Sequence, residues 1–330
     1  MTHNGATPEP VSRFRPSVVL VTGPTSGIGS AVFSRLLEHS SSPCLVLLAR
    51  DQDALEHCVA IARGRGLVAH GIRVDLSDLS TVQAASAAVS RLVERGEIGN
   101  LDAVVLNAGV MLADRRRLSA QGYELTFAVN VLAQHALLRG LQGPLSPRGH
   151  VIVLGSSTHR GKRATLGLVP NPVWQPPAVL SQPERGPLPS RRDSREQGGV
   201  AYASSRLALI TLAHEWADRF ASLGRRLNVY DPGFVVGTGL VRDRRPHEDW
   251  VWRRVMPVMS VIPGVTTPSR TARHLVALAL GETSPDLHDG YVEMGRVSDA
   301  EPVTFDSARR QALWDWCEQT VDEAGTRRAS

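Results

Sequence analysis

The stretch "VTGPTSGIGSAVFSRLL", residues 21–37, is the part of the sequence that most directly indicates the fold. An apolar run typical of a buried strand leads into it, and residues 31–37 carry apolar side chains at helical spacing. Between the two, Gly23, Gly27 and Gly29 allow the backbone to approach a phosphate, and a helix start offers free N–H groups. A strand, a glycine-rich turn and a helix in this order predict a site for the pyrophosphate of a dinucleotide.

Further short apolar runs alternate with segments of helical spacing along the chain. Runs that are apolar throughout indicate strands buried on both faces, and their alternation with helices predicts a parallel sheet with right-handed crossovers. The sequence therefore predicts a single α/β domain with a Rossmann-type, doubly wound parallel sheet. The predicted strands lie at residues 18–21, 44–49, 68–74, 103–106, 151–154 and 227–229.

Pro-, Gly- and Arg-rich stretches suggest how the chain is divided. We expect a flexible N-terminal tail over 1–16, the Rossmann domain over 17–300, and a C-terminal helix and tail over 301–330. Two stretches interrupt the strand–helix alternation: an insertion at 158–200 and a Trp- and Arg-bearing segment at 242–268. Both are longer than an ordinary connection. We expect the second to be a substrate lid.

The composition narrows the class of protein. Of 330 residues, 42% are hydrophobic and 21% are charged, with no apolar run long enough to span a membrane. The N-terminus has no apolar signal segment, so a cytoplasmic protein is expected. Cys44, Cys58 and Cys317 lack the spacing of metal ligands. The net charge of +5 comes from loop-like basic clusters, which predicts neither nucleic-acid binding nor a membrane-bound surface.

The residue after the second predicted strand bears on the choice of cofactor. An acidic residue there would bind the adenosine ribose hydroxyls, whereas a guanidinium pairs with a 2′-phosphate. This chain has Arg50, followed by Asp51, which is suited to cap the next helix. NADP(H) is therefore favoured over NAD(H). The alternative is that Arg50 is solvated and Asp51 binds the ribose.

Five ordered motifs carry a resemblance to a known family: "TGPTSGIG" at 22–29, "NAG" at 107–109, "FAVN" at 127–130, "VIVLGSS" at 151–157 and "YASSR" at 202–206. With them the chain resembles the short-chain dehydrogenase/reductase family over about residues 17–295. Two longer stretches, "GYELTFAVNVLAQHALL" and "YDPGFVVGTGL", are similar to the retinol dehydrogenase and protochlorophyllide reductase branch.

The resemblance implies a role for each matching residue. Tyr202 is the proton donor, Ser157 binds the substrate oxygen with Ser156 as the alternative, and Asn130 holds a water and orients its helix. Thr238 stands one place after the usual threonine, where this chain has Gly237. The cofactor-binding residues implied are Gly23, Thr25, Ser26, Gly27, Ile28, Gly29, Arg50, Asp75, Leu76, Asn107, Ala108, Gly109, Tyr202, Arg206, Pro232, Gly233 and Thr238.

Arg206 departs from the family, which has lysine at this place. Residues i and i+4 share a helix face, so Tyr202 and Arg206 are expected to point into one cleft. A cation beside a phenol favours the phenolate form that proton transfer to a carbonyl oxygen requires. Arginine keeps the charge and the donors but does not release a proton. Lys162 is the only lysine of the chain, so a general replacement of lysine by arginine accounts for Arg206.

These features predict an oxidoreductase that interconverts a ketone or aldehyde and an alcohol. Trp174 in the insertion and Trp250 and Trp252 in the lid suggest a bulky substrate of secondary metabolism. Two alternatives stay open: a catalytically impaired, cofactor-binding scaffold, and a non-redox or internally redox-cycling reaction. The family resemblance also implies a homodimer or homotetramer through the helices that begin near Tyr123 and Tyr202, unless the long loops block it.

Overall fold

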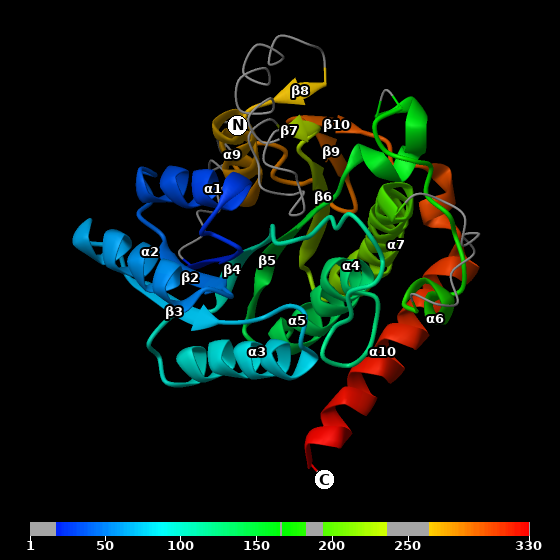
Figure 1. Ribbon diagram of the computed structural model, residues 1–330. Helices are drawn as coiled ribbons and strands as arrows, with labels where there is room; N and C mark the ends of the chain where they lie inside the picture. The colour runs from blue at the N-terminus through cyan, green and yellow to red at the C-terminus, as the bar shows by residue number, and fades with distance from the viewer. Residues whose placement is uncertain (1–17, 166, 183–193, 236–263, 330) are drawn as a thin grey trace, which may run out of the picture.

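An eight-stranded sheet with helices on both faces forms the centre of the molecule (Figure 1). The computed structural model describes residues 18–165, 167–182, 194–235 and 264–329. The strand order is β10-β9-β6-β5-β4-β1-β2-β3, and every pair is parallel except β9 with β10. The predicted doubly wound Rossmann-type sheet is confirmed. The strands are β1 (Val18–Thr22), β2 (Cys44–Ala49), β3 (Ala69–Arg73), β4 (Leu101–Leu106), β5 (Leu145–Leu154), β6 (Arg226–Asp231), β9 (Tyr291–Glu293) and β10 (Arg296–Ser298).

Two helical layers bury the faces of this sheet. One layer holds α1 (Gly27–Leu37), α2 (Gln52–Gly64) and α9 (Pro268–Ala279), and its core includes Leu36, Leu55 and Leu275. The other holds α3 (Leu79–Glu94), α5 (Ala133–Leu141) and α7 (Ser194–Ala221). The strands β1 and β2 lie between both layers and are buried almost throughout, which explains their continuous apolar sequence. The edge strand β3 is buried only at Ala69, and half-buried and exposed positions alternate after it.

The remaining elements are mostly short, and several of them pack against α7. The pair β7 and β8 forms a separate two-stranded ribbon. The π-helical turn η1 lies between α4 and α5. These elements are α4 (Leu125–Phe127), η1 (Ala128–Leu132), η2 (Ser157–Arg163), α6 (Pro177–Leu180), β7 (Phe234–Val235), β8 (Val265–Thr266), η4 (Pro302–Phe305) and α10 (Ser307–Ala329).

Helix α7 begins well before Tyr202, which stands in its interior rather than at its start. From Val200 to His214 each of its residues is buried by the rest of the same chain. A helix that is buried on all sides needs covering beyond the sheet alone. The insertion supplies part of this cover, since the backbone N–H of Val173 donates to Ser204 Oγ of α7 at 2.9 Å.

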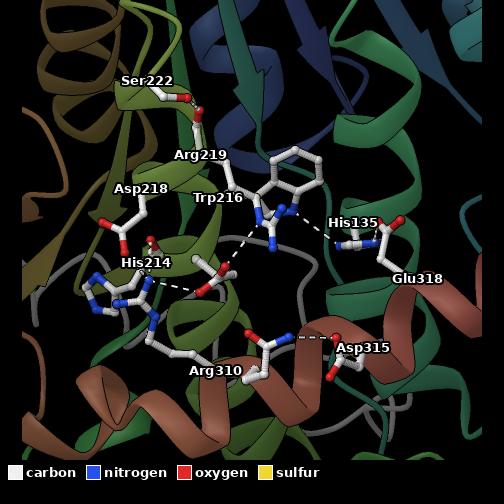
Figure 2. Close-up of polar contacts among 11 residues, drawn as sticks. His135, His214, Trp216, Asp218, Arg219, Ser222, Arg310, Asp315 and Glu318 are labelled. Atoms are coloured by element: carbon white, nitrogen blue, oxygen red, sulfur yellow. Dashed lines mark hydrogen bonds and ion pairs between the residues drawn. The ribbon is translucent and has the colours of Figure 1, made fainter.

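Helix α10 adds to this cover, and Figure 2 shows its Arg310 and Glu318 beside residues of α7 and α5. The indole of Trp314 contacts Trp216 of α7 edge-on, with ring centroids 4.8 Å apart, and Arg219 lies over the same indole. Buried His135 of α5 bonds Glu318 of α10 through Nε2 at 2.8 Å, and its Nδ1 accepts from the Trp216 indole N–H. Packing and buried polar contacts together hold the C-terminal helix on the α5–α7 face.

The expected segment boundaries lie partly outside the described residues. The N-terminal tail does so entirely, as does the expected lid up to residue 263, including Trp250 and Trp252. The last residues of that segment form β8 beside β7. Of the insertion, residues 158–165, 167–182 and 194–200 are described. The domain limits stay predictions. No helix among the described residues is long and apolar enough to cross a membrane.

Candidate active site

The glycine-rich turn between β1 and α1 brings two backbone segments into direct contact. Gly23 and Gly27 have positive φ angles of 67° and 56°, which favour glycine. A Cβ on Gly29 would lie 1.8 Å from the carbonyl oxygen of Gly23. Asn107, at the end of β4, donates its Nδ2 to Thr22 O at 3.0 Å and to Gly23 O at 3.3 Å. The turn is therefore held in one shape by its own glycines and by the neighbouring strand.

The start of α1 faces the open side of this turn. Within the part of the chain that the structure describes, the N-cap Ser26 makes no side-chain capping hydrogen bond. Its side chain is exposed, and Thr25 and Ile28 on either side are half-buried. The first N–H groups of a helix without such a cap are free to bind an anion. This is the arrangement expected for a pyrophosphate.

At the end of β2, Arg50 and Asp51 differ in what their side chains do. Arg50 is exposed at the carboxyl edge of the sheet. Asp51 is the N-cap of α2, and its Oδ1 accepts from the Ala54 N–H at 3.0 Å. Its carboxylate thus has a structural partner in α2.

The end of β3 leads into a short turn made by Asp75 and Leu76. Asp75 Oδ1 accepts from the Ser77 N–H at 3.0 Å and the Ser77 hydroxyl at 2.7 Å. Leu76 is partly buried against the core. These hydrogen bonds hold the turn, and it stands beside the β2 end along the same edge of the sheet.

Asn130 joins three elements of the site through one amide. It is fully buried in η1, a π-helical turn of the kind often found at functional sites. Its Oδ1 accepts from the Val110 N–H at 2.8 Å, and its Nδ2 donates to Val110 O at 2.9 Å and to Ser205 Oγ at 3.0 Å. The amide therefore fixes the loop after β4 against α7. Its expected role as a water ligand stays a prediction.

Tyr202 and Arg206 lie together in a buried position on α7. Each is 4% exposed, and the Arg206 Cζ lies 5.0 Å from the centroid of the Tyr202 ring. Arg206 Nη1 donates to Leu154 O, near the end of β5, at 2.9 Å. A Cβ on Gly109 would lie 2.3 Å from Arg206 Nη2, so the guanidinium occupies space that only glycine leaves free.

The serine pair follows β5 at the same edge of the sheet. Ser157 is the half-buried first residue of η2, and Ser156 is the N-cap of that turn. Ser156 Oγ accepts from the Thr158 N–H at 3.3 Å and from the Thr158 hydroxyl at 3.0 Å. Ser156 is thus engaged in capping, which favours Ser157 of the two as the ligand of a substrate oxygen.

Asp231 positions the turn after β6. Its Oδ1 accepts from the Gly233 N–H at 2.8 Å, and its Oδ2 accepts from the Tyr291 hydroxyl at 2.5 Å. Complete burial raises the pKa of this carboxyl to about 6, although both hydrogen bonds oppose the shift. Gly233 has φ of 68°, and Pro232 before it is buried. Thr238 lies outside the described residues.

The model of the short chain dehydrogenase family matches residues 17–166, which include the glycine-rich turn, the end of β4, Asn130 and the serine pair. The strands that lead into the turn, into Asn107 and into the serine pair are β1, β4 and β5, which are neighbours in the sheet. Over these matched residues the chain belongs to the short-chain dehydrogenase/reductase family. It is an oxidoreductase of the kind that acts on CH–OH and C=O groups.

Relatives of this short-chain dehydrogenase/reductase cover nearly all of its length. A probable oxidoreductase of Streptomyces lividans is 27% identical over 92% of this chain and 96% of its own. A short chain dehydrogenase from Burkholderia cenocepacia in complex with NADP has a TM-score of 0.61 at 22% identity, covering 86% of this chain and 99% of its own. The structure of the angucycline C-6 ketoreductase LanV with bound NADP has a TM-score of 0.61 at 19% identity. It covers 85% of this chain and 95% of its own. These two structures show the same fold.

Sequence reasoning missed several residues that hold the site together. Thr22 Oγ1 accepts from the Ala108 N–H at 3.0 Å, and Gln134 Nε2 donates to Ala108 O at 3.2 Å. Ser205 bonds both Asn130 and the carbonyl of Tyr202. Thr22 and Ser205 stand inside the quoted motifs, so their position was a usable signal. Gln134 stands inside the longer quoted stretch at 122–138, but only the folded structure shows its bond to the loop after β4.

The structure brings the expected catalytic residues together and separates them from the adenosine end. Tyr202, Arg206, Asn130 and Gly109 are joined by the contacts described above, and Ser157 follows the strand whose Leu154 bonds Arg206. Arg50 and the Asp75 turn lie at the ends of β2 and β3, on the other side of β1. An extended dinucleotide would span these two regions.

The chain's own residues fit such a dinucleotide. The buried Arg206 Nε has no hydrogen-bond partner among the described residues, and a buried donor without a partner costs free energy. A ribose hydroxyl would satisfy this donor. The Gly23–Gly29 contact likewise closes the turn so tightly that side chains are excluded from its inner surface.

Proposed function

We propose that this enzyme is an NADP(H)-dependent oxidoreductase that interconverts a bulky ketone or aldehyde and its alcohol, with Tyr202 as the acid–base residue. The observation that carries the proposal is the buried pair of Tyr202 and Arg206, held by Leu154 O beside Gly109. A phenol fixed beside a cation is the arrangement that proton transfer to a carbonyl oxygen would use.

The cofactor would lie along the carboxyl edge of the sheet, from Arg50 to Arg206. When bound, the nicotinamide supplies or accepts the hydride. The turn at Gly23 to Gly29 and the start of α1 would hold the pyrophosphate, the Asp75 turn would border the adenine, and Asn107 to Gly109 would form a wall of the groove. Pro232 and Gly233, fixed by Asp231, would contact the nicotinamide end.

The protein's own residues would manage the proton and the developing negative charge. Ser157 would donate a hydrogen bond to the substrate oxygen, and Tyr202 would donate the proton to it. Arg206 would hold the ribose through Nε, but a guanidinium does not give up its proton. Tyr202 would therefore regain its proton through a hydroxyl or water rather than through the side chain of residue 206.

The preference for NADP(H) follows from Arg50. Its guanidinium is exposed at the place where the 2′-phosphate would stand, and the Asp51 carboxylate is used in capping α2. A guanidinium binds phosphate through paired hydrogen bonds. The two structural neighbours described above were solved with NADP, which supports this choice.

The size of the proposed substrate rests on the long insertion and on the ketoreductase relative, whose substrate is an angucycline. The ring of Trp174 contributes less than its sequence position suggested. It is partly buried against the core, with Arg309 of α10 placed 5.0 Å from the centroid of its ring. Trp174 therefore serves to pack the insertion onto α10.

The test measures NADPH and NADH oxidation by the purified full chain with a panel of large and small ketones. Tyr202→Phe removes only the hydroxyl, so we expect kcat to fall by about a hundredfold or more while NADPH binding changes by no more than about twofold. Arg206→Lys restores a side chain that can relay a proton, so we expect it to remain active. Arg206→Leu removes the charge and should lose most of the activity.

Two results would contradict the proposal. Activity in Tyr202→Phe equal to wild type would remove Tyr202 from the chemistry. A wild-type protein that binds NADPH and turns over no carbonyl, but becomes active as Arg206→Lys, would be a cofactor-binding scaffold. Turnover of small ketones only would leave the reaction intact and overturn the substrate class.

A further inference from the structure

A second arginine stands beside Arg50 at the carboxyl edge of the sheet. Arg73 is the last residue of β3, and it is paired in register with Ala49, the residue before Arg50. Its Nε donates to the carbonyl oxygen of Arg50 at 3.2 Å. The two guanidiniums therefore belong to one corner of the molecule, although 23 positions separate them in the sequence.

This corner is an open hollow that holds two guanidiniums and two carboxylates. It is lined by Arg50, Asp51, Gln52, Asp53 and Arg73. Asp51 caps α2, and Gln52 Nε2 bonds Glu56 along the helix at 2.6 Å. No carboxylate among the described residues forms an ion pair with Arg50 or Arg73. Because neither guanidinium is held by a described carboxylate, both remain able to pair with a doubly charged anion in the hollow.

We propose that Arg73 is the second arm of a clamp that binds the 2′-phosphate of NADP(H), with Arg50 as the first arm. This inference rests on the cofactor of the proposed function. The bond from Arg73 Nε to the β2 end fixes the guanidinium plane, and the edge formed by its two terminal nitrogens remains for a phosphate. Arg73 would thus be a specificity-determining residue of the cofactor site.

The competing explanation is that Arg73 only ties the ends of β2 and β3 together. A structural tie would affect NADPH and NADH alike, because the backbone at Arg50 serves both. A phosphate clamp would affect only ligands that carry the 2′-phosphate. The two explanations therefore differ in the ratio of two dissociation constants.

The experiment measures dissociation constants of the full chain for NADPH, NADH, 2′,5′-ADP and 5′-AMP by fluorescence titration and calorimetry. Arg73→Gln keeps a donor near Arg50 O and removes the charge. We expect the dissociation constants for NADPH and 2′,5′-ADP to rise by about tenfold or more, as loss of a charged hydrogen bond implies. Those for NADH and 5′-AMP should stay within about twofold of wild type. Arg50→Gln should behave alike, and the double variant should lose the preference for NADPH.

Arg65→Gln is the matched control, because Arg65 is an exposed arginine at the far end of α2. It removes the same charge, so any loss it shares with Arg73→Gln is a long-range charge effect. If Arg73→Gln weakens the binding of NADPH and NADH equally, Arg73 only links the ends of β2 and β3 and the phosphate clamp is overturned. No change with either ligand would leave the phosphate to Arg50 alone and overturn it too. Turnover is measured separately with NADH, so a failed clamp and a failed reductase give different results.

Discussion

The guanidinium of Arg206 lies over the ring of Tyr202, with Cζ 5.0 Å from the ring centroid, while its Nη1 bonds the carbonyl of Leu154. A lysine at this place would bring one terminal nitrogen, whereas arginine here engages the strand, faces the phenol ring and keeps Nε for a further acceptor. The substitution has therefore been accommodated by the surrounding backbone, and Gly109 is the residue that makes room for it.

Gly109→Ala tests this accommodation. The new Cβ would lie 2.3 Å from Arg206 Nη2, so the guanidinium must move, and we expect kcat/KM to fall by about tenfold or more. In the Arg206→Lys background the planar group is absent, and the same substitution should cost much less. Steady-state kinetics of the four proteins gives the coupling. Equal losses in both backgrounds would mean that Gly109 does not act through Arg206.

Gly29→Ala tests the phosphate turn. Its Cβ would meet the Gly23 carbonyl oxygen at 1.8 Å, a backbone atom that cannot turn aside, so we expect NADPH binding to weaken by about a hundredfold or to be lost. The control is Gly64→Ala in α2, where a Cβ meets nothing within 4 Å. That variant should bind NADPH normally and gain about 0.5 kcal/mol of stability. Equal NADPH affinity in the two variants would exclude a tight turn at Gly29.

Asp231 predicts a pH dependence of stability with a definite sign. Burial raises its pKa from 3.8 to about 6, so its contribution to folding is present at low pH and is lost as the pH rises through 6. Asp231→Asn cannot ionise. We expect wild type to lose about 2 kcal/mol relative to this variant between pH 4.5 and 7.5, measured by urea unfolding.

The comparison with Asp231→Asn is necessary because a nearby histidine acts in the opposite direction. Burial lowers the pKa of His159 to about 4, so its contribution is lost as the pH falls below the usual histidine range. His159 packs on Tyr291, the partner of Asp231, at 5.2 Å between ring centroids, and Arg160 and Glu293 complete the charged surroundings. A pH-independent difference between the two proteins would show that Asp231 titrates normally.

The burial of α7 predicts that the protein does not form a dimer or tetramer through α5 and α7. Residues from Val200 to His214 are covered within one chain, and α10 holds the α5–α7 face through Trp314 and Glu318. Sedimentation at about 10 µM should give the 35.7 kDa monomer. A dimer that substitutions on α5 or α7 disrupt would contradict this expectation.

Trp314→Ala tests whether α10 buries the α5–α7 face. Removing the indole leaves a cavity between Trp216 and Arg219, and we expect a loss of about 3 kcal/mol of stability, measured by urea unfolding. If α10 is what keeps the face closed, the variant should also begin to self-associate as concentration rises. A variant as stable as wild type would mean that α10 does not bury this face.

The sequence by itself determined six strands of the sheet and the glycine-rich turn, but not the strands β9 and β10 at one edge. These features depend on local rules: buried strands are apolar throughout, a helix start binds anions, and glycine adopts the backbone of a tight turn most readily. For that reason the limits predicted for β2 agree with the structure. The roles of Asn107, Asn130 and Tyr202 come from the family resemblance of short motifs and stay predictions.

Only the tertiary structure decided what surrounds those residues. Leu154 and Gly109, which accommodate Arg206, are distant from it in the sequence, and so is Arg73 from Arg50. The docking of α10 on α7 likewise depends on Trp314 meeting Trp216, and the apolar pattern of either helix does not specify its partner. Such contacts arise when the folded sheet brings separate strand ends and helices together, and no local rule of the chain predicts them.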